Sequence, residues 1–318
     1  MDNQPKETAS GESPAHALFN PPVCRADLRP SVRLGFGDFV DWAASETGWE
    51  REQLERCIFH GGVWVGRFRW ANRGDIDAGE LVRLYRFEYE PASLELADDV
   101  ILHEDERWLV VNKPSWIPVQ GTRASMRLSL EHMLKTRCGT DWLSPVHRLD
   151  RQTSGVNVFA KSALAFEHAA AQFRRQRVKK RYLAKLADSA EMPSGCEWSV
   201  RLFQTRRAHS SHSAFCAVDS AHPNAREGVT EFRIRDRAHA LVEAMPRTGR
   251  THQIRLHLAE TVGPIAGDTL YGEPWRPGAP QRVLLHAERL QLQSATGENS
   301  VFLAPAPDEL TLSVGVNT

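Results

Sequence analysis

The feature that most constrains the fold is a series of short segments in which apolar and polar residues alternate. Two of them, "GVTEFRIRD" (228–236) and "HALVEAMP" (239–246), follow each other closely, and "RVLLHAERLQLQ" (282–293) and "NSVFLAP" (299–305) come later. Successive side chains of a strand point to opposite faces, so this period of two predicts half-buried strands. The short connection between the first two predicts that they are antiparallel neighbours.

Helical signals are fewer than strand signals. Ser162 is a suitable N-cap for "ALAFEHAAAQFRRQR", and "THQIRLHLAETVG" (251–263) is predicted as a helix capped by Thr251 and closed by Gly263. A buried strand over 108–111 should stop at Lys113-Pro114, because proline cannot donate to a ladder. Strands and helices do not alternate regularly. We therefore expect an α+β fold with a mixed, largely antiparallel sheet and flanking helices.

Composition shifts along the chain predict three segments. Residues 1–30 are polar and proline-rich and are expected to form a disordered or extended arm. Residues 31–92 read as a small domain with two short helices followed by strands, whose last strand is anchored by Leu81, Leu84 and Phe87. Residues 93–318 form the larger domain.

The overall composition excludes several classes of protein. The 318 residues carry no net charge, which argues against a protein that coats nucleic acid indiscriminately. No stretch approaches the roughly 18 apolar residues of a membrane span, and five scattered cysteines predict free thiols, so a cytoplasmic location is expected. Basic runs near 174–181, 204–212 and 247–255 nevertheless favour an anionic partner.

The segment "HRLDRQTSG" (147–155) places Asp150 between Arg148 and Arg151. A lone aspartate in a loop is usually a helix cap or an ion-pair partner. However, flanking guanidinium groups favour the ionised carboxylate, and the following Thr-Ser-Gly can present it into a cleft. An ionised carboxylate can act as a nucleophile without a general base.

Two further segments carry candidate site residues. "PRTGRTHQIRLH" (246–257) projects Arg250, His252 and Arg255 from a turn and a helix start, either as solvated side chains or as an anion site. In "KKRYLAK" (179–185), Tyr182 follows the basic run and could pack against the core or stack on a nucleobase.

Metal and nucleotide sites lack support. His209, His212 and Cys216 have spacings that a metal could use, but no further ligand pair completes a tetrahedral set. Neither a G-x-x-x-x-G-K-[ST] nor a G-x-G-x-x-G segment is present.

Together, "HRLDRQTSG", "KKRYLAK" and "RTGRTHQIRLHLA", in this order, resemble the RluA-type family of RNA pseudouridine synthases. The resemblance extends to "VVNKPSWIPVQG", "GDTLYG" and "LLHAERLQL" and covers about residues 100–310. More weakly, "CIFHGGVWVGRFR" and "GDIDAGELVRL" resemble the small αL RNA-binding module, although its usual basic, leucine-rich opening helix is missing.

The resemblance implies an isomerase that converts uridine in structured RNA to pseudouridine, with no metal or organic cofactor. Asp150 would be the catalytic nucleophile, Tyr182 would stack on the flipped uracil, and Arg255 would pair with the catalytic carboxylate. Substrate contacts are expected from a larger set of basic residues: Arg148, which would fill the vacated base stack, and Arg151, Arg250, His252, Arg174, Arg175 and Lys180.

Several alternatives stay open at this stage. The partner is ribosomal or transfer RNA, with ribosomal RNA favoured, and neither DNA nor a membrane; the chain is expected to be a monomer. The carboxylate could attack the sugar or the ring. A catalytically silent RNA-binding or ribosome-assembly protein and a nucleoside hydrolase are the competing functions.

Overall fold

The computed structural model describes residues 13–70, 74–92, 95–208, 214–293 and 299–311. The chain divides into two compact units, which are described separately. The larger unit comprises residues 1–17, 96–116 and 142–318, and the smaller comprises 18–95 and 117–141. Residues 117–141 thus group with the small unit by their contacts, and the boundary near residue 92 stays a prediction.

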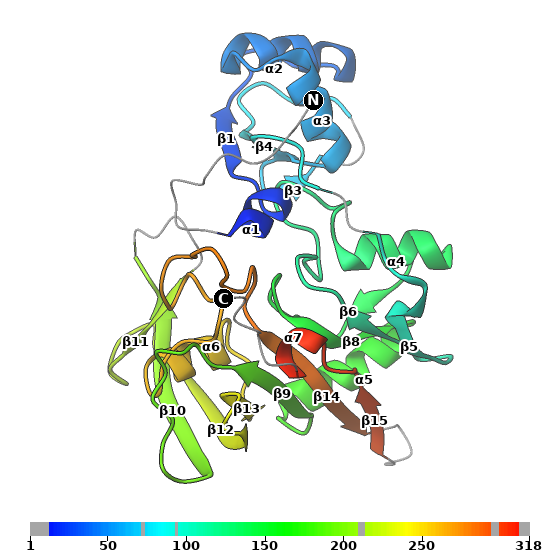
Figure 1. The fold of residues 1–318 in the computed structure, drawn as a ribbon. Coiled ribbons are helices and arrows are strands. Elements are labelled where there is room, and N and C mark those ends of the chain that lie inside the picture. The colour runs from blue at the N-terminus through cyan, green and yellow to red at the C-terminus, as the bar shows by residue number, and fades with distance from the viewer. Residues whose placement is uncertain (1–12, 71–73, 93–94, 209–213, 294–298, 312–318) are drawn as a thin grey trace. The chain divides into compact units, whose positions relative to one another are not determined.

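An eleven-stranded sheet forms the larger unit (Figure 1). Its main path runs β11-β10-β12-β13-β9-β14-β8-β6-β5, with β15 beside β14 and β7 beside β8. All pairs are antiparallel except β8 with β14, which confirms the predicted mixed, largely antiparallel sheet. The strands are β5 (Ile101–Glu104), β6 (Trp108–Lys113), β7 (Ser144–Pro145), β8 (Ser154–Ala160), β9 (Lys179–Lys185), β10 (Glu197–Arg206), β11 (Phe215–Val218), β12 (Arg226–Asp236), β13 (Leu241–Pro246), β14 (Leu285–Gln293) and β15 (Asn299–Leu303).

The alternating segments form the predicted strands. β12 and β13 pair antiparallel, with Phe232 opposite Ala244, which confirms the expected neighbours. β6 is buried along most of its length and ends at Lys113, where proline stops the ladder. Periodicity therefore located these elements correctly.

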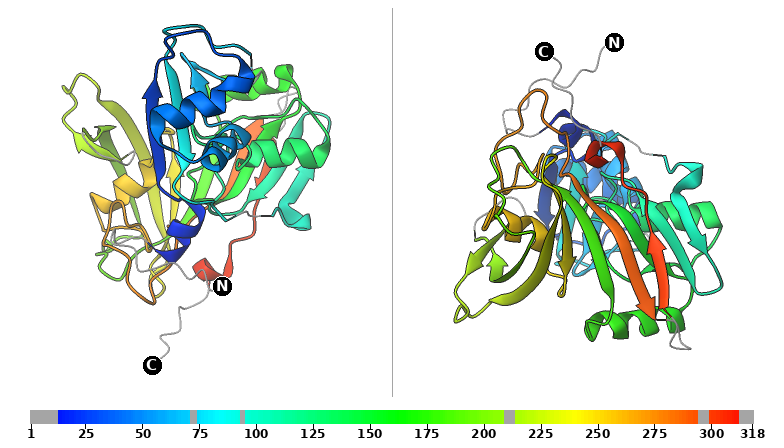
Figure 2. Two further views of the ribbon diagram at one scale, coloured as in Figure 1. Left: turned by 90° about the horizontal axis from the view of Figure 1, so that it is seen from above. Right: turned by 60° about the horizontal axis from the view of Figure 1, so that its bottom comes forward.

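Helices α1 (Pro14–Phe19), α5 (Ala163–Arg174), α6 (Gln253–Ala259) and α7 (Asp308–Thr311) accompany the sheet, with a short 3-10 turn η2 (Asp98–Val100). α5 lies against the sheet (Figure 2). Its Ala165 and Ala169 belong to the buried cluster that contains Val158 of β8 and Leu290 of β14. The hydroxyl of Ser162 accepts a hydrogen bond from the Ala165 amide, which confirms the predicted N-cap.

The start of α6 differs from the prediction. The helix begins at Gln253, and its N-cap is His252 in a left-handed conformation (φ 56°) with no side-chain cap, so Thr251 is not the cap. The side chain of Gln253 explains the shift, because its Oε1 accepts hydrogen bonds from the Thr248 hydroxyl and the Arg250 amide. These bonds hold residues 248–252 in a loop. The helix also ends at Ala259, before Gly263.

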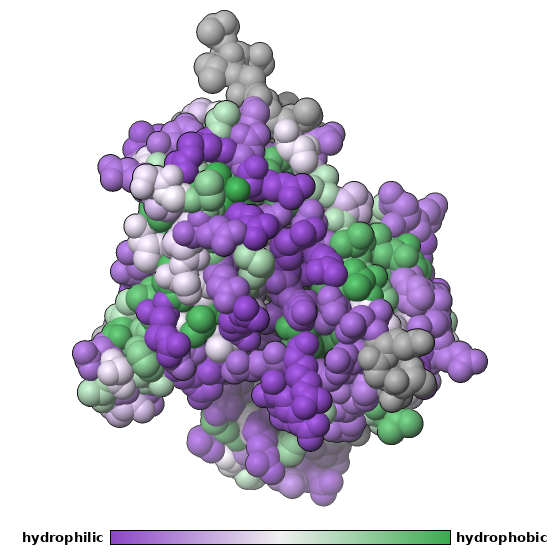
Figure 3. All heavy atoms as spheres, turned by 90° about the horizontal axis from the view of Figure 1, so that it is seen from below, coloured by the Kyte–Doolittle hydropathy of each residue, from purple (hydrophilic) through white to green (hydrophobic). Residues whose placement is uncertain are grey.

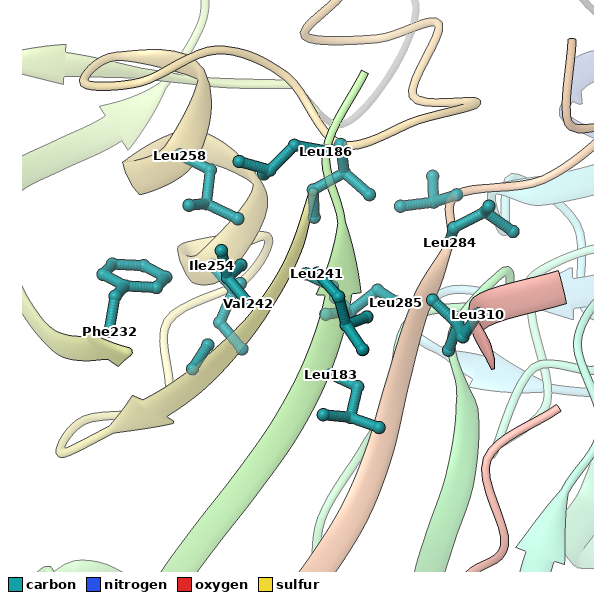
Figure 4. Close-up of a cluster of buried hydrophobic side chains, with 14 of the residues drawn as sticks. Leu183, Leu186, Phe232, Leu241, Val242, Ile254, Leu258, Leu284, Leu285 and Leu310 are labelled. Atoms are coloured by element: carbon teal, nitrogen blue, oxygen red, sulfur yellow. The ribbon is translucent and has the colours of Figure 1, made fainter. Parts of the chain in front are cut away.

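A second part of the core of the larger unit lies against α6. Ile254 and Leu258 of α6 point toward Val242 of β13, and Leu183 and Leu285 of β9 and β14 belong to the same buried cluster (Figure 4). This packing fixes α6, and therefore its polar side chains, against the central strands.

The smaller unit has a four-stranded sheet of order β1-β4-β2-β3. Its elements are β1 (Val23–Leu28), η1 (Phe36–Asp38), α2 (Phe39–Thr47), α3 (Arg51–His60), β2 (Val63–Val65), β3 (Phe68–Arg69), β4 (Val82–Phe87) and α4 (Leu130–Cys138). The two helices and the following strands were predicted. In β4, however, Val82 and Leu84 are buried, whereas Leu81 and Phe87 are only half-buried.

The described part of the predicted arm contains a short helix and an extended strand. Pro14–Phe19 is helical, and Val23–Leu28 pairs with β4 along its whole length. Backbone pairing with a distant strand supplies order that the local polar sequence does not indicate. Residues 1–12 of the arm lie outside the described residues, and no helix among those described is long and apolar enough to cross a membrane.

Candidate active site

Asp150 lies in the loop that leads into β8, and its side chain is 27% exposed. Its carbonyl accepts a hydrogen bond from the Thr153 amide at 3.1 Å, which closes a tight turn. One carboxylate oxygen is 3.8 Å from Nη1 of Arg255, and the other is 3.9 Å from Nε2 of His252. The fold thus brings together two segments that are about a hundred residues apart.

Arg255 has a second, closer partner that the sequence analysis did not identify. Its Nε and Nη2 donate to the two oxygens of Asp268 at 2.6 and 2.7 Å, and Asp268 is fully buried. Burial by itself would lower the pKa of Arg255, but Asp268, with help from Asp150, raises it above its ordinary value. The guanidinium is therefore permanently charged and held by Asp268, while Nη1 faces Asp150. The segment "GDTLYG" contained the signal for this partner.

A chain of hydrogen bonds orients the imidazole of His252. The Tyr271 hydroxyl accepts from the Phe215 amide at 3.0 Å and lies 3.0 Å from Nδ1 of His252. Burial raises the pKa of Tyr271 to about 12 and lowers that of His252, so both groups are neutral at pH 7. If the phenol donates its one proton to Nδ1, then Nε2 carries a proton directed at Asp150. The opposite tautomer would aim a lone pair at the carboxylate, so we assign the first.

Tyr182 occupies the centre of the sheet next to this cluster. It lies opposite Ala244 of β13 and Ala287 of β14, two small residues that leave room beside its ring. Burial raises its pKa above the ordinary value, and the charge of Asp150 acts in the same direction. The phenol is therefore neutral, and the half-buried ring packs against the hydrophobic cluster that contains Ala244.

The loop of Asp150 is fixed by residues that were not predicted as site residues. Nζ of the buried Lys113 donates to the carbonyls of Pro114 and Arg151 at 2.8 and 3.1 Å. Oε1 of Gln152 accepts from the Val283 amide at 2.8 Å. These bonds join the loop to the end of β6 and to the segment before β14. Lys113 lies in "VVNKPSW", and its position before a proline is the sequence feature that could have identified it as a site residue.

Gly155, the last residue of the segment "HRLDRQTSG", lies where β8 pairs with β14. Its φ is 111°, and a Cβ at this position would lie 2.2 Å from the carbonyl oxygen of Ala287 in β14. Only glycine permits this close approach of the parallel pair β8 and β14. The glycine therefore positions the strand that begins just after the aspartate.

The arginines that flank Asp150 do not share one environment. Arg148 is exposed. Arg151 is half-buried, and burial lowers its pKa to about 10. Both therefore differ from Arg255, which approaches the carboxylate from α6.

The other predicted contact residues lie along the 247–253 loop and the basic run. Arg250 donates from Nε to the carbonyl of Glu227 at 2.9 Å. Lys180 donates to the carbonyl of Thr248 at 2.8 Å, and burial lowers its pKa to about 8. Arg174 and Arg175 instead form the end of α5, where Arg174 lies 3.8 Å from Glu167.

Among the described residues, no group of histidine, cysteine, aspartate or glutamate side chains could hold a metal ion. His209 and His212, which the sequence analysis considered, lie outside these residues.

Comparisons with known proteins agree with this geometry. Residues 107–260 match the RNA pseudouridylate synthase family. The chain is 31% identical over 272 residues to ribosomal large subunit pseudouridine synthase C of Vibrio parahaemolyticus, covering 81% of this chain and 82% of that protein. It is 33% identical over 218 residues to the dual-specificity RNA pseudouridine synthase RluA of Escherichia coli, covering 65% and 93%. Among solved structures, human RNA pseudouridylate synthase domain containing 1 matches with a TM-score of 0.56 and 27% identity, covering 68% of this chain and 89% of that one. The chain therefore belongs to the RluA-type family of RNA pseudouridine synthases, which are RNA uridine isomerases.

Proposed function

We propose that Asp150 is the nucleophile with which this isomerase converts uridine to pseudouridine, and that its substrate is ribosomal RNA. The observation that supports Asp150 is the unequal exposure of two carboxylates around Arg255. Asp268 is fully buried and bound to the guanidinium at two points, whereas Asp150 is 27% exposed and lies 3.8 Å from it. Of these two groups, only Asp150 can reach a substrate.

The surrounding groups suit an anionic nucleophile. The positive charge of Arg255 and the Nε2 proton assigned to His252 face the two oxygens of the carboxylate and orient it without a direct hydrogen bond. The base must leave its stack, which costs a few kcal/mol, and the ring of Tyr182 offers a replacement surface. Isomerisation breaks the N1–C1′ bond and forms a C5–C1′ bond, while the proton on C5 is lost and N1 gains one. Neither an oxidant nor a phosphate donor is consumed.

The names of the relatives favour ribosomal RNA. Relatives from Vibrio parahaemolyticus and Neisseria meningitidis are large-subunit synthases C and D, and the Escherichia coli relative is described as dual-specificity. We further propose that the smaller unit, with its four-stranded sheet, helps to orient the RNA.

Substitution of the nucleophile tests the proposal. Asp150→Asn keeps the size of the side chain but removes the charge, so turnover should be abolished while RNA affinity changes little. The matched control is Asp188→Asn, a change at an exposed position. Pseudouridine formation and RNA binding are measured on both. Loss of binding in Asp150→Asn would indicate a structural carboxylate instead.

A map of pseudouridine in total RNA from a deletion strain tests the substrate. We expect one or a few sites to be lost in ribosomal RNA and restored by the wild-type chain. If Asp150→Ala restored the strain's growth as well as the wild type does, the RNA-binding role would replace the catalytic one.

A further inference from the structure

The central strands separate below Tyr182. β9 and β13 pair only from Tyr182 to Lys185, opposite Ala244 to Leu241. Toward its start, β9 continues beside β14, where Lys179 lies opposite Gln291, whereas the end of β13 stays with β12. A groove of about 610 Å³ lies between the separated strands. Its lining includes Arg181 and Glu243, whose side chains lie on the face of the sheet opposite to that of Tyr182 and Ala244.

The groove is strongly cationic. Its lining includes seven arginine or lysine side chains, from Arg177 to Arg289 in sequence, but only two acidic ones, Glu231 and Glu243. Hydrophilic side chains also predominate on the underside of the molecule, where β14 ends and β9 begins (Figure 3). Such a density of one charge raises the local concentration of an anionic ligand.

Some of these cations already have carboxylate partners in the fold. Arg247 binds both oxygens of Glu231 at 2.8 and 3.0 Å, and Arg181 binds Glu288 at 2.5 Å. Arg233 is 2.6 Å from Glu197. These pairs are ordinary solvent-exposed salt bridges between neighbouring strands.

Three of the basic side chains that line the groove are not paired with a carboxylate in the described part of the chain. Among the residues that the structure describes, none of Arg177, Lys179 and Arg289 lies within ion-pair distance of a carboxylate; Arg289 donates to the Gln291 side chain at 3.1 Å. Lys180, next to them, binds only a carbonyl oxygen, that of Thr248. This surplus of positive charge is available to an external anion.

We infer that this groove binds the phosphate backbone of the substrate RNA. The inference rests on the proposed function and extends it to a second part of the unit. The volume falls within the range of about 300–1,000 Å³ that suits ligands larger than a single phosphate. The cations without carboxylate partners give charge complementarity to a polyanion.

Salt dependence of binding tests this inference. The full chain carrying Arg177→Ala and Lys179→Ala is compared with wild type for binding to a labelled oligouridylate over a range of KCl concentrations. Each lost phosphate contact of a single strand lowers the slope of log K against log[salt] by about 0.7, so the double variant should lose about 1.4. The control is Arg107→Ala with Lys161→Ala, which removes the same two residue types near β5 and β6.

The outcomes separate the groove from the proposed reaction. An unchanged slope in the groove variant, or an equal loss in the control, overturns the inference. Pseudouridine formation is measured on the same proteins with a ribosomal RNA transcript. If the wild type binds with the expected slopes but isomerises nothing, the groove stands and the proposed reaction fails. Circular dichroism of both double variants verifies that they are folded.

Discussion

The pair formed by Arg255 and Asp268 should be the most sensitive ion pair in the larger unit. Arg255 is 7% exposed and Asp268 is fully buried. Because water reaches neither charge, each side chain depends on the other for stabilisation. Asp268 also accepts hydrogen bonds from the amides of Leu270 and Tyr271 at 3.1 and 3.2 Å. Removing one partner of a buried pair costs about 3–5 kcal/mol. Because asparagine keeps one acceptor oxygen, we expect Asp268→Asn to lower the free energy of unfolding by about 3 kcal/mol.

Calorimetry of the full chain measures this effect. For a domain of this size, about 3 kcal/mol corresponds to a fall in Tm of roughly 6–12 °C. The control is Glu273→Gln, since Glu273 and Arg276 form a pair at 2.7 Å with side chains 62% and 75% exposed. Such a pair contributes about 0–1 kcal/mol. Equal Tm values for the two variants would refute the argument that burial makes the Asp268 pair different.

The same variant should also slow catalysis. Without Asp268, the guanidinium of Arg255 is free to rotate toward Asp150 and form a direct hydrogen bond, which stabilises the resting carboxylate. Single-turnover pseudouridine formation, at a temperature where the variant is folded, should therefore be slower than in wild type. An unchanged rate would mean that Arg255 needs no orienting partner.

Three further predictions follow from single contacts. Tyr271→Phe removes the donor to Nδ1, so ¹⁵N NMR should show His252 with its proton on Nε2 in wild type and a mixture of tautomers in the variant; the same spectrum for both would contradict the assigned hydrogen-bond chain. Gly155→Ala places a Cβ against the β14 backbone and should destabilise the chain by about 1–3 kcal/mol or more, seen as a lower urea midpoint; a midpoint equal to wild type would show that the strands move apart freely. Burial lowers the pKa of His257 from 6.5 to about 4, so the unfolded state binds the extra proton and stability falls by about 3 kcal/mol as the pH drops between these values. His257→Leu should remove that part of the acid sensitivity in urea unfolding, and a variant as acid-sensitive as wild type would disprove it.

Elements that depend on neighbouring residues could be predicted from the sequence. Alternation located β12 and β13, and Ser162 marked the start of α5. The start of α6 could not be predicted in this way. Thr251 is a good local cap, but the side chain of Gln253 bonds within the loop and moves the N-cap by one residue, to His252.

The aspartate motif and the histidine-glutamine-arginine helix indicated the family and the candidate residues from sequence alone. The resemblance to the family also implied that Arg255 pairs with Asp150, which spacing alone left open. What only the tertiary structure decided is how the charges are shared. Asp268 rather than Asp150 holds Arg255, and the Tyr271 hydroxyl lies within hydrogen-bond distance of Nδ1 of His252. In the part of the chain that the structure describes, Arg177 and Lys179 of the basic run line the groove between β9 and β13 without a carboxylate partner. Local sequence determines backbone preference within a few residues, whereas these pairings depend on distances between strands and loops far apart in the chain, which only the packed fold establishes.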